Sequence, residues 1–172
     1  MRCDELLLRL QDEVVDREAH LLRELPWKGF KCAVDYDLRR LEVSFGSSEL
    51  LLRIHQFEPN TDDWLDDAKK PDFHGHPFRI AVAVLSGSGD MELGCWDERL
   101  NPVHLWTLRL GPRVLYSMEP RDINHRFWIR SRVLTVSLVE GSSPTESEEL
   151  LCSEEIEDIL ERAVSRLSTC GF

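Results

Sequence analysis

The chain has 172 residues, of which 42% are hydrophobic and 31% charged, and 32 acidic against 21 basic side chains give a formal net charge of −11. This length predicts one domain, residues 1–172, that buries a hydrophobic core without the help of disulfides or metals. No apolar run approaches the roughly 20 residues that cross a bilayer. Because a net negative charge repels phosphate backbones, the composition argues against nucleic acid as well as against a membrane as a partner.

A helix is predicted at the N-terminus, within residues 1–28. Leucines and valines recur at helical spacing over residues 4–24, so that they share one face. Asp4 is a suitable N-cap, and Pro26 ends the pattern because proline cannot continue a helix. The acidic residues in this segment do not suit a secretory signal.

Residues 30–140 change to the alternating pattern of short β-strands. The β-branched stretch after Arg79 is predicted to end in a glycine turn at Gly87. Residues 125–139 are predicted to form a hairpin folded around Arg130–Arg132. Roughly eight evenly spaced strands indicate an all-β-dominated barrel of the antiparallel or jelly-roll type. An acidic loop precedes the second half of this barrel, and its Trp64 suits a lid over the barrel mouth.

The last part of the chain, residues 141–172, is predicted to carry a second helix. A connector over residues 141–147 leads to an amphipathic helix over residues 153–167. The acidic, amphipathic helices at the two ends offer a surface for a second copy of the chain, as a homodimer, or for another partner.

Five cysteines occur, at 3, 32, 95, 152 and 170, and no two of them form a CxxC pair. An odd number of cysteines without metal-finger spacing argues for reduced thiols and for core or surface roles. We therefore expect a cytoplasmic protein.

Three histidines carry the functional argument. His74 and His76 are two residues apart, so on a strand both imidazoles point to the same face. His125 begins a later strand, and antiparallel pairing would bring it across the barrel. Imidazole is a good ligand for zinc, iron, copper and nickel. A chance pair of histidines on the surface or in the core is the alternative.

Two motifs around these histidines resemble the signatures of the cupin superfamily. The first is His74-Gly75-His76-Pro77-Phe78-Arg79-Ile80, followed by AVAVLS and Gly87. The second is Pro120-Arg121-Asp122-Ile123-Asn124-His125, in which a proline turn stands five residues before the third histidine. The resemblance covers about residues 50–140. It implies a double-stranded β-helix barrel, with the terminal helices outside it.

The resemblance also implies a metal site with a departure from the usual ligands. His74, His76 and His125 match the three histidine ligands, whereas Ile80 stands where the family has a glutamate and cannot bind a metal. Asp122 and Ile129 replace a glycine and an asparagine of the second motif. The chain is thus similar to the three-histidine cupins such as the thiol dioxygenases, and to small bacterial cupins. A barrel that has lost its metal is the alternative.

Several further side chains are candidates for substrate binding or proton transfer. Arg53 and His55 share one face of their strand, and if that face is inward Arg53 can hold a carboxylate; an outward face with a surface ion pair is an equal alternative. Arg79, Tyr116 and Arg121 are candidates by position. His104 is a further histidine whose strand could neighbour the metal.

From these implications we expect a metal-dependent enzyme. The leading hypothesis is a non-heme iron(II) oxygenase, dioxygenase-like, acting on a small polar metabolite such as an amino acid or a thiol. Zinc or another divalent transition metal in the same site, serving a non-oxidative isomerisation or bond-forming step, is an alternative. A non-catalytic, ligand-binding barrel is a third.

Overall fold

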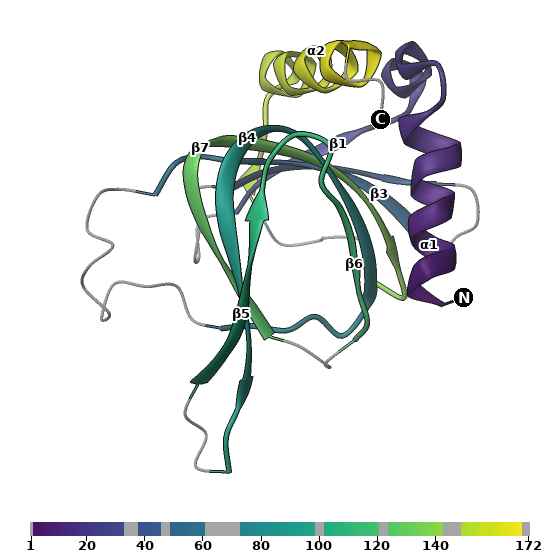
Figure 1. The fold of residues 1–172 in the computed structure, drawn as a ribbon. Helices are drawn as coiled ribbons and strands as arrows, with labels where there is room; N and C mark the ends of the chain where they lie inside the picture. The colour runs from purple at the N-terminus through teal and green to yellow at the C-terminus, as the bar shows by residue number, and fades with distance from the viewer. Residues whose placement is uncertain are drawn as a thin grey trace.

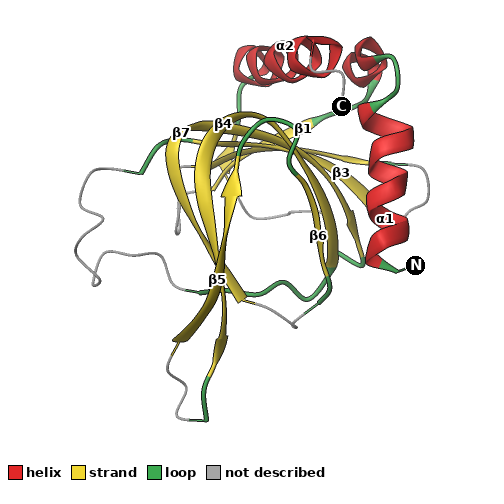
Figure 2. Ribbon diagram, in the orientation of Figure 1, coloured by secondary structure: helices red, strands yellow, loops and turns green. Residues whose placement is uncertain are grey.

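A computed structural model describes residues 2–32, 38–45, 49–60, 73–98, 102–120, 124–142 and 149–169. Helices lie at both ends of the chain and strands fill the middle (Figure 2). The elements are α1 (Cys3–Leu10), η1 (Gln11–Val15), η2 (Ala19–Glu24), β1 (Lys28–Cys32), β2 (Leu38–Ser44), β3 (Leu50–Phe57), β4 (Arg79–Trp96), β5 (Pro102–Leu110), β6 (Leu115–Met118), β7 (Asn124–Glu140), β8 (Glu149–Leu150) and α2 (Ser153–Thr169).

The strands form one antiparallel sheet that curls into a barrel (Figure 1). Their order is β5-β4-β7-β3-β2-β1-β8, and β6 pairs with β4 beside β5. Both terminal helices cover the outer face of the sheet, with α2 lying across its top in this view and α1 along its side. The predicted β-dominated barrel with a helix at each end is confirmed.

Strand β3 shows how alternation separates the core from the barrel interior. Leu50, Leu52 and Ile54 are buried in the apolar core that the sheet shares with α1 and α2. Arg53 and His55, which point to the opposite face of the strand, line a cavity inside the barrel. Because side chains alternate along a strand, the inward face that sequence alone left open is the one that carries Arg53 and His55.

The N-terminal helix is shorter than predicted. Residues 4–24 form an α-helix, a π-helical turn and a separate 3-10 helix in place of one continuous helix. The backbone N–H of Asp16 donates to the carbonyl of Gln11, five residues earlier, and this wider turn lets Val14 and Val15 both be buried.

Two predicted turns are wrong, and both belong to one bend. Strand β4 continues through Gly87, and β7 runs unbroken through Arg130–Arg132, so residues 125–139 form no hairpin. The register between β4 and β7 shifts at successive points from Val84 to Gly89, opposite Ser131–Leu134. Paired bulges therefore bend both strands together, which curls the sheet without ending either strand.

The described helices include none that is long and apolar enough to span a membrane.

Candidate metal centre

Strand pairing brings His74 opposite His125. The two residues form an isolated antiparallel bridge in which the His74 N–H donates to the His125 carbonyl over 3.0 Å and the His125 N–H donates back over 2.8 Å. His125 lies at the start of β7 and also pairs with Leu93 of β4. The bridge thus fixes the backbone that carries two of the three predicted ligands.

The three imidazoles converge on one point. One ligand nitrogen of each of His74, His76 and His125 lies within 4.8 Å of those of the other two. The ring centres of His74 and His76 lie 4.5 and 4.9 Å from that of His125. This spacing suits three nitrogens around a single transition-metal ion, for which metal–nitrogen bonds are about 2.0–2.1 Å.

The protonation of these histidines also suits a metal. Both ring nitrogens of His125 are buried and make no hydrogen bond to the described residues. Burial, with smaller contributions from His74 and His76, holds the pKa of His125 well below its usual value. Burial also lowers the pKa of His76 to about 4, with His74 and Arg53 adding to the effect. Neutral imidazoles with bare nitrogens are the form that ligates metals.

Aromatic rings hold two of the imidazoles in place. Phe78 stacks on His76, with ring centres 4.7 Å apart and planes 16° from parallel. Phe127 meets His125 edge to face at 5.0 Å. These contacts restrict the rings' orientation and keep one side of the site apolar.

Phe73, directly before His74, anchors the metal-binding segment to the sheet. Its ring is buried and lies against Gly94, where a Cβ atom would stand only 2.7 Å from it. The Arg126 guanidinium lies over the same ring at 4.4 Å and donates from Nε to Glu92 over 2.7 Å. We call Phe73, Glu92, Gly94 and Arg126 the Phe73 clamp.

Replacing Arg126 with methionine is expected to weaken metal binding by about three- to tenfold. The change removes a cation–π contact worth roughly 0.5–2 kcal/mol and frees the segment that positions His74. Competition titration with a metal chelator measures the affinity. Arg126→Lys, which keeps the cation, should restore part of the loss.

Arg130→Met is the matched control for the clamp. Arg130 also crosses from β7 to β4, where it pairs with Asp90, but its side chain is 65% exposed and touches none of the clamp residues in the described contacts. Equal losses of metal affinity in Arg130→Met and Arg126→Met would show that the clamp has no positioning role.

The histidines open onto a cavity of about 370 Å³ inside the barrel. Most of its wall is apolar, and Ile80 is part of it. The polar residues of the wall, apart from the three histidines, come from neighbouring strands and one connector: Arg40, Arg53, His55, Tyr116, Thr135 and Ser142. The volume suits a small metabolite.

Arg53 is the best-placed of the predicted substrate-binding residues. It is 5% exposed, and its Nε donates to Glu42 over 2.7 Å while Nη2 donates to Ser142 over 3.2 Å. The Phe78 ring lies 5.4 Å from its guanidinium carbon. Arg53 therefore places a fixed positive charge in the same cavity as the histidine triad.

His55 and Tyr116 also line this cavity. Burial is the main cause that holds the pKa of His55 well below its usual value, and the charges of Arg40, Arg53 and His76 add to it. Burial raises the pKa of Tyr116. At neutral pH the cavity therefore presents a neutral imidazole and a protonated phenol.

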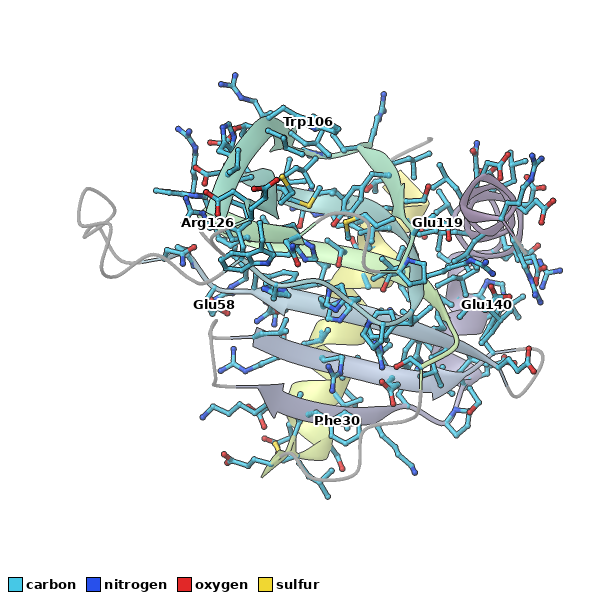
Figure 3. All side chains as sticks on the ribbon, turned by 90° about the horizontal axis from the view of Figure 1, so that it is seen from below. Phe30, Glu58, Trp106, Glu119, Arg126 and Glu140 are labelled. Atoms are coloured by element: carbon cyan, nitrogen blue, oxygen red, sulfur yellow. The ribbon has the colours of Figure 1, made fainter. Side chains whose placement is uncertain are left out.

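Other predicted candidates lie elsewhere. Arg79 is not among the cavity residues and instead pairs with Glu119 and Glu140, which lie side by side at one side of the barrel (Figure 3). His104 is exposed on β5, where its Nε2 shares a hydrogen bond with the Thr107 hydroxyl. Trp64 and Arg121 lie outside the described residues.

Sequence reasoning did not find Arg40 and Glu42. Both lie on β2, where Arg40 pairs with His55 and Glu42 with Arg53. The spacing of two residues was the available signal, because it puts both on one face.

No protein-family model matches the chain, and no curated protein matches it. Among solved structures it is similar to Fe(II)-HppE crystallised with an alternative substrate, at 17% identity over 67% of this chain and with a TM-score of 0.47. It is also similar to KdgF from Halomonas sp., at 15% identity over 70% of this chain and 92% of that chain, with a TM-score of 0.46. An RmlC-like cupin from Shewanella frigidimarina matches at 11% identity over 70% of this chain and 86% of that chain, with a TM-score of 0.45. The match spans 56% of the HppE chain.

Proposed function

We propose that this protein is a metal-dependent enzyme, a non-heme iron(II) oxygenase acting on a small polar metabolite such as an amino acid or a thiol. The observation that carries the proposal is the convergence of His74, His76 and His125, with bare nitrogens on His125, at the wall of a largely apolar cavity inside the barrel. Buried polar atoms ordinarily have hydrogen-bond partners, so two bare nitrogens on one buried imidazole favour a ligand role over packing alone.

His74, His76 and His125 would hold the iron(II), which would supply oxygen activation when bound. The chain's own residues supply the rest. Arg53 binds and orients an anionic group of the substrate through its guanidinium donors. Phe78 and Phe127 exclude water from the two imidazoles they contact.

Two residues can hold a proton at the substrate. The phenol of Tyr116 stays protonated at neutral pH and can donate a hydrogen bond or a proton from Oη. His55 stays neutral, so one ring nitrogen can accept a proton from the bound group. Both side chains line the cavity that the triad faces.

Anaerobic loading with iron(II), followed by oxygen-uptake measurements with a panel of amino acids and thiols, tests the proposal. The expected result is iron-dependent uptake with at least one panel member, lost in His76→Ala. Tyr116→Phe removes the proton donor and should lower the rate of uptake by about a hundredfold or more.

Uptake that is absent with every panel member would contradict the oxygenase. Stoichiometric zinc in the purified protein, together with turnover under nitrogen, would replace it by the zinc alternative, since zinc supplies Lewis-acid chemistry without oxygen.

A further inference from the structure

A second polar cluster lies in the cavity away from the histidine triad. Arg40 and Glu42 of β2 face the same side of the sheet as His55 and Arg53 of β3, with which they pair directly. Ser142, beyond the end of β7, completes the cluster by accepting from Arg53 over 3.2 Å. Three segments of the chain, β2, β3 and the connection after β7, thus meet in this cluster.

At the cavity surface this cluster has more positive than negative charge among the described residues. Among the described residues that line the cavity, the ionised side chains are the two arginines, Arg40 and Arg53. Glu42 lies behind them, 4% exposed, with a carboxylate oxygen 2.7 Å from the Arg53 Nε and 3.8 Å from the Arg40 Nε. The wall therefore presents positive charge, which one buried carboxylate partly offsets.

The surroundings strengthen this positive field. Aromatic rings lie next to both guanidinium groups, Phe30 at 5.7 Å from Arg40 and Phe78 at 5.4 Å from Arg53. Both cations lower the pKa of the neighbouring His55 in addition to the effect of burial. Electrostatic attraction is stronger in such apolar surroundings than in water, so an anion in the cavity would be held by more than a surface pair.

We propose that Arg40, Arg53 and Ser142 form a carboxylate-binding subsite, and that Glu42 sets its preference for a single negative charge over a double one. The planar guanidinium groups match the two oxygens of a carboxylate. Glu42 supports Arg53 and offsets part of the arginine charge, which disfavours a dianion such as phosphate. The substrate class is a small carboxylic acid.

The inference rests on the proposed function only for the end of the bound carboxylic acid that faces the histidine triad. Carboxylate binding itself needs no metal. It can therefore be measured on the metal-free protein, and its failure is distinguishable from failure of the metal site.

Isothermal titration calorimetry of the metal-free full chain with propionate, propionamide and inorganic phosphate at pH 8 provides the test. Propionate should bind more tightly than phosphate, and the uncharged propionamide, which has nearly the same shape, should bind at least about tenfold more weakly than propionate. Glu42→Gln should move the preference towards phosphate by on the order of tenfold, because one buried negative charge is removed while a hydrogen-bond acceptor is kept.

Arg40→Gln tests the same claim by removing a positive charge from the subsite, where Glu42→Gln removes a negative one. Its guanidinium is 14% exposed, and its loss should weaken phosphate more than propionate, each by on the order of tenfold or more. Arg109→Gln, which removes one positive charge from a side chain that is 87% exposed, should leave both affinities unchanged. Circular dichroism and cooperative thermal unfolding of each variant show that the barrel is folded.

Equal binding of propionate and propionamide would overturn the subsite. So would an unchanged propionate affinity in folded Arg40→Gln. A Glu42→Gln protein that folds and keeps the wild-type preference would overturn the role of Glu42. If Glu42→Gln does not fold, an equal loss of both anions in Arg40→Gln overturns that role instead.

Discussion

Replacement of His125 by alanine is expected to abolish stoichiometric metal binding and to weaken the metal affinity by more than about a hundredfold. Loss of a residue that only supports a metal ligand already costs roughly 10- to 100-fold in affinity, and loss of a ligand should cost more. The His125 ring lies 4.5 and 4.9 Å from the other two ring centres, which are 5.3 Å from each other, and His125 is 1% exposed. Two imidazoles would remain, which is too few for a tight site. Elemental analysis and chelator competition measure the effect.

His104→Ala is the matched control for this loss. His104 is also a histidine on a strand, but it lies exposed on β5 and outside the cavity residues. Its replacement should leave metal content and affinity at the wild-type level. Retention of one equivalent of metal by folded His125→Ala would contradict the triad.

Replacement of Gly87 by alanine is expected to lower the free energy of unfolding by about 3 kcal/mol or more. Gly87 has φ +90°, a conformation that costs L residues energy, and an added Cβ would overlap the Arg132 carbonyl oxygen and stand 2.7 Å from the Val133 Cα. These are backbone atoms of the paired strand, so no side-chain rotation relieves the clash. Urea unfolding measures the change.

Gly111→Ala provides the control, because no heavy atom outside the adjacent residues lies within 4 Å of an added Cβ there. It should change the free energy of unfolding by no more than about 0.5 kcal/mol. Similar small changes in the free energy of unfolding for Gly87→Ala and Gly111→Ala would contradict the close backbone approach of β4 and β7 at Gly87.

The same bend shows which parts of the fold local sequence can predict. Alternation identified the strand-rich middle and helical spacing identified α2, because both patterns repeat over neighbouring residues. Gly87 and Arg130–Arg132 carry turn signals, but each lies opposite the other in the sheet. A bulge and a turn have similar local sequences, and only the pairing of distant strands distinguishes them.

The functional site, too, was predictable from the sequence only in part. The spacing of His74 and His76 predicts a shared face, whereas the approach of His125 depends on a bridge between distant segments. Arg40 and Glu42 reach the cavity through the register of β2 against β3, which no short stretch of sequence encodes. Arg79 could have been excluded by parity, since its neighbour Ile80 points into the cavity.

Anomalous X-ray scattering at the iron absorption edge, from crystals of iron(II)-loaded protein grown under nitrogen, tests the metal centre most directly. We expect one strong peak per chain, about 2.0–2.2 Å from a ring nitrogen of each of His74, His76 and His125, with none near Ile80. Well-ordered crystals with no peak between the three imidazoles, or with a peak only at surface histidines such as His104, would contradict it.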